Sequence, residues 1–101
     1  MGRFGEAIAQ RVLEDHGLKV VARNLVVNNG EIDLLALDGD VIVAVEVRTV
    51  TAGDDPIDAI GDAKRSRVQR LAPQLGAQRV DFVGIRLDPD SVVFHWVPDG
   101  F

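Results

Sequence analysis

Acidic residues interrupt two apolar segments of this chain. Asp33 stands within the segment 31–37, and Glu46 follows thirteen residues later, near the end of the apolar run 41–47. A carboxylate on a buried strand is costly unless it is paired or binds a cation. Hard divalent cations prefer oxygen ligands, so the two acids predict a site for Mg²⁺ or Mn²⁺.

The two segments are expected to be adjacent strands. Both are rich in Val, Ile and Leu, and Asp38-Gly39 between them is a hairpin signal. A two-residue loop would set Asp33 diagonal to Glu46 on one face, and a four-residue loop would set them directly opposite. A three-residue loop without a bulge would separate them. Glu31 shares the face of Asp33, but an exposed acid at a strand start is the favoured interpretation for it.

A helix over residues 3–16 precedes the strands. Phe4, Ile8 and Val12 recur at helical spacing, Leu13 widens this apolar stripe, and Gly17 follows as a stop signal. On the helical wheel Glu6 falls beside Leu13 at the edge of the stripe. Its carboxylate can therefore lean toward the sheet that the helix covers.

The remaining elements complete a single domain spanning residues 1–101. Strands are expected at 19–27, 79–87 and 91–97, besides the two acidic ones. A second helix opens at Asp54-Asp55-Pro56, and Pro73 should end or kink it near Leu71-Ala72. The order helix, three strands, helix, two strands predicts an α/β (α+β) fold.

Lys64 is unusual because it stands inside the apolar stripe of the second helix. Its ammonium either escapes to water past the core or reaches a carboxylate or phosphate, and the two interpretations are level. Between residues 63 and 80 there is no acid. The basic residues there could contact a phosphate backbone, although an exposed helix face explains Arg65 and Arg70 equally well. They are Lys64, Arg65, Arg67, Arg70 and Arg79.

Composition narrows the function classes. The net charge of −5 argues against a purely electrostatic nucleic-acid binder. The absence of cysteine excludes a disulfide scaffold, a thiolate metal site and a cysteine nucleophile. No apolar stretch approaches the roughly 20 residues of a membrane span, and the N-terminus lacks a signal-peptide pattern. A soluble, cytoplasmic protein is expected.

An Asp on one strand followed by Glu-x-Lys on the next resembles the signature of restriction-endonuclease-like nucleases, which include the archaeal Holliday junction resolvases. Over nearly the whole chain the sequence is most similar to the YraN-like family of uncharacterised bacterial proteins. The ordered matches to that family are Gly5-Glu6, Arg23-Asn24, Gly30 to Leu34, Glu46-Val47, Lys64, Arg79-Val80-Asp81 and Phe101. The chain departs from the pattern at Arg48, where the family has Lys.

The resemblance implies a restriction-endonuclease-like fold, with a central mixed sheet flanked by helices. Asp33 and Glu46 would then be the main ligands of Mg²⁺ or Mn²⁺, with Glu6 as a second or outer ligand and the Val47 carbonyl as a further one. Lys64, Arg65, Arg67 and Arg70 would contact DNA. The family Lys would stand beside the attacking water. Arg48 cannot act there as a base, although it can hold a phosphate.

Two functions remain open from the sequence. The first is a metal-dependent endonuclease acting on branched or otherwise structured DNA. The second is a catalytically weak or inactive nucleic-acid-binding or adaptor domain on the same fold. The sequence leaves the oligomeric state open, with a homodimer as one option.

Overall fold

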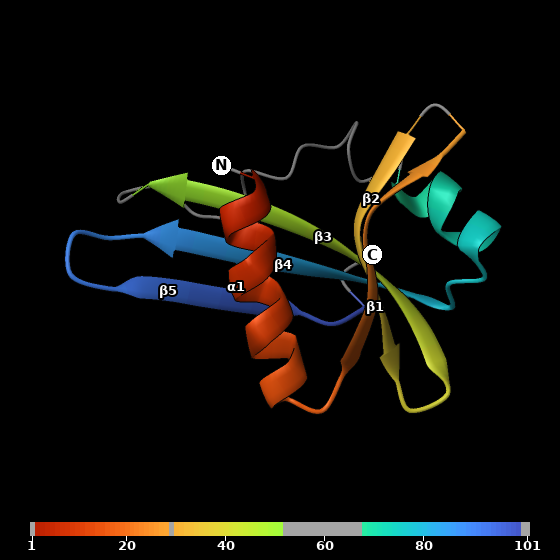
Figure 1. The fold of residues 1–101 in the computed structure, drawn as a ribbon, viewed down its shortest axis with the longest axis horizontal. Coiled ribbons are helices and arrows are strands. Elements are labelled where there is room, and N and C mark those ends of the chain that lie inside the picture. The colour runs from red at the N-terminus through yellow and green to blue at the C-terminus, as the bar shows by residue number, and fades with distance from the viewer. Residues whose placement is uncertain (1, 29, 52–67, 100–101) are drawn as a thin grey trace.

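The computed structural model of the chain describes residues 2–28, 30–51 and 68–99, with side chains described from residue 4 onward. Five strands form one sheet in the order β1-β2-β3-β4-β5 (Figure 1). Neighbouring strands are antiparallel except for the parallel pair β3 and β4. The elements are α1 Gly2–Asp15, β1 Lys19–Val27, β2 Gly30–Asp38, β3 Val41–Thr51, η1 Ala72–Leu75, β4 Arg79–Leu87 and β5 Val92–Val97. The fold is therefore α+β with a mixed sheet, as predicted.

The element boundaries follow the predicted ones closely except at the end of β3. β1 and β4 have the predicted bounds, α1 and β2 differ by one residue at each end, and β5 differs by one residue at its start. β3 runs four residues past the predicted 41–47 because its ladder with β4 continues to the pair Thr51 and Leu87. The apolar pattern ends at Arg48, whereas backbone pairing does not depend on side-chain polarity.

The turn between β2 and β3 lies one residue later than predicted. Asp38 pairs with Val41, so the loop is Gly39-Asp40, and Gly39 supplies the positive φ of 60° that a tight turn requires. The register is nevertheless that of the four-residue alternative. It runs from the turn to the pair Leu34 and Val45. Beyond that pair the two strands diverge, β2 staying with β1 and β3 with β4 (Figure 1).

α1 packs on one face of the sheet through a stripe that shares Ile8 and Leu13 with the predicted one but excludes Phe4. Ala9 and Leu13 are completely buried, whereas Phe4 is 52% exposed. Gly5 is also buried, so the closest approach falls on the small residues Gly5 and Ala9. The prediction that Phe4 faces the core is wrong, because the helix approaches the sheet most closely at Gly5 and Ala9, whereas Ile8 still packs against the core.

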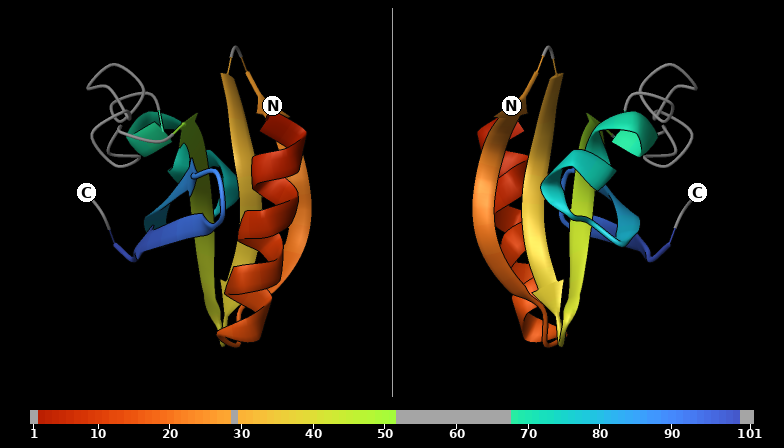
Figure 2. Two further views of the ribbon diagram at one scale, coloured as in Figure 1. Left: turned by 90° about the vertical axis from the view of Figure 1, so that its left-hand side faces the viewer. Right: turned by 90° about the vertical axis from the view of Figure 1, so that its right-hand side faces the viewer.

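The opposite face is covered by a helical segment that ends before β4 (Figure 2). Residues 68–71 are α-helical and continue into the 3-10 turn η1, so the predicted break near Pro73 is confirmed. Val68 and Leu71 pack with Ile32 and Ala44. The predicted start of this helix and Lys64 lie outside the described residues. Within the described ranges, no helix has the length and apolarity needed to cross a bilayer.

Candidate metal centre

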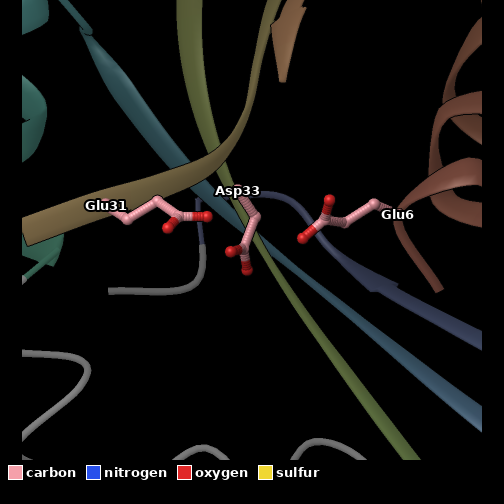
Figure 3. Close-up of side chains that lie close together, drawn as sticks. All are labelled: Glu6, Glu31 and Asp33. Atoms are coloured by element: carbon pink, nitrogen blue, oxygen red, sulfur yellow. The ribbon is translucent and has the colours of Figure 1, made fainter. Parts of the chain in front are cut away.

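Three carboxylates converge beside the point where β2 and β3 diverge. Glu6 comes from α1, while Glu31 and Asp33 come from β2 (Figure 3). One oxygen from each group lies within 4.8 Å of the other two. Glu6 is only 6% exposed, Asp33 is partly buried and Glu31 is exposed. The structure thus brings together the predicted residues Glu6 and Asp33, and it adds Glu31.

The divergence of the strands explains how Asp33 is held. The ladder between β2 and β3 stops at Leu34 and Val45, one position before Asp33. There the backbone N–H of Val47 donates to Asp33 Oδ2 at 2.9 Å. A side-chain oxygen of β2 therefore accepts a backbone N–H of β3 at the point where the two strands diverge. This bond fixes the Asp33 carboxylate between the two strands.

β1 supplies a polar neighbour on the other side of β2. Arg23 pairs with Leu34 and Leu25 with Ile32, so the register places Asn24 across from Asp33. Asn24 has a φ of 54°, which is uncommon for a residue with a side chain. Its side chain hydrogen-bonds to Glu6. Asn24 therefore links the helix carboxylate to the strand pair.

Glu6 is buried because of its place on α1. It precedes Ala9 by three residues and Leu13 by seven, which is the helical spacing of one face. The two apolar residues are fully buried, so the face they define carries Glu6 toward the sheet. Glu6 Oε1 is buried and has no hydrogen-bond partner among the residues that the structure describes. This is the costly arrangement that a bound cation would relieve.

The electrostatics of the cluster are unfavourable for ionised Glu6. Burial raises the pKa of Glu6 above its ordinary value, and the nearby carboxylates of Asp33 and Glu31 raise it further. The hydrogen bond from Asn24 and the positive charge of Arg23 act in the opposite direction. The net direction is upward. A group that is hard to ionise alone becomes a good ligand when a cation supplies the missing positive charge.

The donor set and the spacing fit a hard divalent cation. Oxygen ligands lie roughly 2.0–2.1 Å from Mg²⁺ and about 2.3–2.6 Å from Ca²⁺. Two oxygens on opposite sides of one ion are therefore about 4–5 Å apart. The 4.8 Å that bounds the carboxylate oxygens is within this range. All three residues could contact one ion with small side-chain adjustments.

Glu46, predicted as a main ligand, lies near the cluster in sequence but outside the group of three. Within the described part of the chain, the convergent carboxylates are the three named above. Leu34, Val45 and Val47 all pack in the core beneath α1, so strand alternation directs Asp33 and Glu46 alike away from that core. The Glu46 carboxylate is buried at 1% exposure. Its role as a ligand, like that of the Val47 carbonyl, stays a prediction.

The predicted DNA contacts are described only in part. Arg70 is exposed at an open pocket, next to Asn28 and Gln74, whose side chains hydrogen-bond to each other. Arg48 is exposed on β3. Lys64, Arg65 and Arg67 lie outside the described residues.

Arg79, counted above among the phosphate-contacting candidates, belongs to a structural network. It donates to both oxygens of Asp81, from Nε at 2.8 Å and from Nη2 at 3.0 Å, and its Nη1 reaches Asp38 at 2.8 Å. Asp81 is completely buried and also accepts from Trp96 Nε1 at 3.0 Å and from the Asp99 N–H at 2.9 Å. These carboxylates engage all three nitrogens of the guanidinium, which gives Arg79 a structural role, and a phosphate contact by Arg79 stays a prediction.

The sequence interpretation missed two contributors to the cluster. Asn24 belongs to the Arg23-Asn24 match, but no role was assigned to it. Glu31 is exposed at the start of β2, as predicted, but its place in the cluster is not part of that prediction. The available signal was strand alternation, which sets Glu31 and Asp33 on one face. The position of Asn24 opposite Asp33 needed the register of β1, which the sequence does not give.

Comparison with known sequences supports the family resemblance. The sequence model of the Uncharacterised protein family UPF0102, the YraN-like family, matches residues 5–85. A UPF0102 protein of Streptomyces griseus is 38% identical over 96 residues, covering 84% of this chain and 81% of the relative. A UPF0102 protein of Arthrobacter sp. strain FB24 is 40% identical over 95 residues, covering 84% and 80%. One of Leifsonia xyli is 39% identical with the same coverage.

Proposed function

Since this chain belongs to the Uncharacterised protein family UPF0102, its activity has to be inferred from its own site, and we propose that it is a metal-dependent nuclease acting on DNA. The observation that carries the proposal is the convergence of Glu6, Glu31 and Asp33, with Glu6 buried. Three carboxylates without a cation would repel one another. The proposed cofactor is Mg²⁺ or Mn²⁺.

The side chains have distinct tasks in this proposal. Asp33, fixed by the Val47 N–H, and Glu6, carried by α1, hold the cation from two elements. Exposed Glu31 completes the group from the solvent side. We further propose Glu46 and the Val47 carbonyl as ligands contributed by β3. A divalent cation bound here would neutralise phosphodiester charge and acidify a water molecule.

The substrate side of the proposal depends on basic residues. Arg48 is exposed on β3, two residues beyond Glu46, and a guanidinium there can hold a phosphate oxygen. Arg70 would contact the DNA backbone from the opposite helical segment, together with Lys64, Arg65 and Arg67. Structured or branched DNA is the proposed substrate class, by resemblance to the Holliday junction resolvases. The proposed fold class is restriction-endonuclease-like. The mixed sheet and the position of Asp33, where β2 and β3 diverge, support it.

A second candidate is a DNA-binding or adaptor domain that does not cleave. Arg48 favours it, because it replaces the Lys of the family pattern and cannot accept a proton. Cation binding alone does not separate the two candidates, since a metal can be retained for structure or for phosphate binding.

A cleavage assay separates them. The protein is incubated with Mg²⁺ or Mn²⁺ and with duplex, single-stranded, flap and four-way junction DNA. We expect cleavage of at least one structured substrate, its loss in Asp33→Asn, and a gain in Arg48→Lys because an ammonium is a more compact donor. Binding without cleavage in both wild type and Arg48→Lys would support the adaptor. Equal cleavage by wild type and Asp33→Asn would refute the proposed site.

A further inference from the structure

Gly5 lies where α1 crosses β3, and its missing side chain lets the two elements come close together. A Cβ built on Gly5 would overlap Oγ1 of Thr49. The next nearest atoms are Cβ of Thr49 at 3.5 Å and Cγ1 of Val47 at 3.7 Å, which are ordinary contacts. A side chain at Gly5 therefore collides with one atom, the Thr49 hydroxyl oxygen.

This contact is adjacent to the carboxylate cluster on both elements. On the helix, Glu6 directly follows Gly5. On the strand, Val47 is two residues from Thr49, and its N–H holds Asp33 Oδ2. The distance between Gly5 and β3 therefore controls the distance between a carboxylate fixed to the helix and one fixed to the strand.

Helix stability does not explain a glycine here. Gly is less favourable than Ala within a helix, because it loses more backbone freedom on folding. Gly5 also has no positive φ, the conformation for which glycine is needed elsewhere in the chain. Close approach to β3 is the remaining physical reason for a residue without a side chain.

We propose that Gly5 is a positioning residue, which sets the separation of Glu6 from Asp33 and thereby the cation affinity of the cluster. The inference rests on the metal-binding part of the proposed function. Thr49 cannot easily give way, because heavy atoms fill two of the three staggered positions on its branched side chain. Relief of the collision to an ordinary contact takes a shift on the order of 1 Å.

Gly5→Ala should therefore weaken Mn²⁺ binding measured by titration calorimetry by about tenfold to a hundredfold. Thr49→Ala removes the colliding oxygen and should restore the affinity when combined with Gly5→Ala. Thr49→Val keeps the branched shape and should not restore it. Each Thr49 substitution alone should leave the wild-type affinity unchanged, because the space at Gly5 is retained.

Thermal unfolding of the same variants tests the contact independently of the cation. Gly5→Ala should lower the melting temperature of the metal-free protein, and adding Thr49→Ala should recover it, since Ala then favours the helix without a collision. Unchanged Mn²⁺ affinity in Gly5→Ala would overturn the inference. So would failure of the double variant with Thr49→Ala to recover both affinity and stability. Absence of Mn²⁺ binding in wild type would instead overturn the proposed metal site itself.

Discussion

Asp81 and Glu6 are both buried carboxylates, but their surroundings are opposite. Asp81 accepts four hydrogen bonds, two on each oxygen, and two of them come from the Arg79 guanidinium. Glu6 receives one side-chain hydrogen bond from Asn24, faces Asp33 and Glu31, and buries Oε1 without a partner among the described residues. The partners of the Asp81 carboxylate all come from the protein, whereas the Glu6 carboxylate would gain its missing partner from a bound cation.

The difference also shows what each acid does for the fold. The Asp81 network joins the start of β4, the end of β5 and, through Arg79 and Asp38, the turn after β2. Glu6 and Asp33 instead bring like charges together where two strands part. Burial of a charge stabilises a structure only when its partners are in place. Oε1 of Glu6 has no such partner among the described residues, and this predicts opposite responses to mutation at Glu6 and at Asp81.

The largest expected effect is the loss of stability in Asp81→Asn. The substitution keeps the volume but puts an amide donor among four donors and removes the charge that accepts two of the three Arg79 hydrogen bonds, leaving the one to Asp38. Breaking a buried ion pair in this way costs about 3–5 kcal/mol. Denaturant unfolding measures the free energy of unfolding. The matched control is Asp88→Asn, which breaks the more exposed Arg86 pair and should cost about 0–1 kcal/mol. Equal losses in both variants would remove the distinction drawn for Asp81.

The next effect is stabilisation by a cation. Free Mn²⁺ at 100 times its dissociation constant should stabilise wild type by about 2.7 kcal/mol, because it binds only the folded state. Asp33→Asn should abolish this stabilisation, while its amide oxygen can still accept the Val47 N–H. Asp40→Asn, at the exposed turn after β2, is the control for loss of one charge. Equal stabilisation of wild type and Asp33→Asn in a thermal shift assay would rule out the cluster as the binding site.

Local signals were sufficient for most of the fold. Apolar runs with turn residues between them placed β1 and β4 at their observed bounds, and Pro73 ended the second helix where expected. The local signals failed where tertiary contacts determine the structure. The end of β3 is set by pairing with β4, and the exposure of Phe4 is set by how closely Gly5 admits the sheet. The local sequence pattern identifies neither β4 as the partner of β3 nor the sheet contact at Gly5.

The residues of the candidate site also fall into those that local sequence signals identify and those that depend on tertiary contacts. Glu6 and Asp33 were identified because acids among apolar residues are visible in the sequence. The membership of Glu31 depends on β2 leaving β3 after Leu34, and that of Asn24 depends on the register of β1. Strand alternation alone sets Glu31 on the face of Asp33, and it permits a Glu31 near Glu6 or a Glu31 far from it. The path of the backbone decides between them.

The smallest effect is expected for Glu6→Gln, and the sign of its change in melting temperature should depend on the cation. The pKa of Glu6 is raised in the folded protein above its ordinary value of 4.5, chiefly by burial and then by Asp33. Protonated Glu6 therefore favours folding. Its contribution is fully present below pH 4.5 and is lost as the pH rises through the raised pKa.

Glutamine cannot ionise, so in the absence of metal Glu6→Gln should match wild type at low pH and melt at a higher temperature at neutral pH. Mn²⁺ should reverse this order at neutral pH, since only the carboxylate can bind the cation strongly. Glu14→Gln, exposed on the same helix, controls for the loss of one negative charge from α1. A metal-free Glu6→Gln protein less stable than wild type at neutral pH would show that Glu6, like Asp81, is completed within the protein.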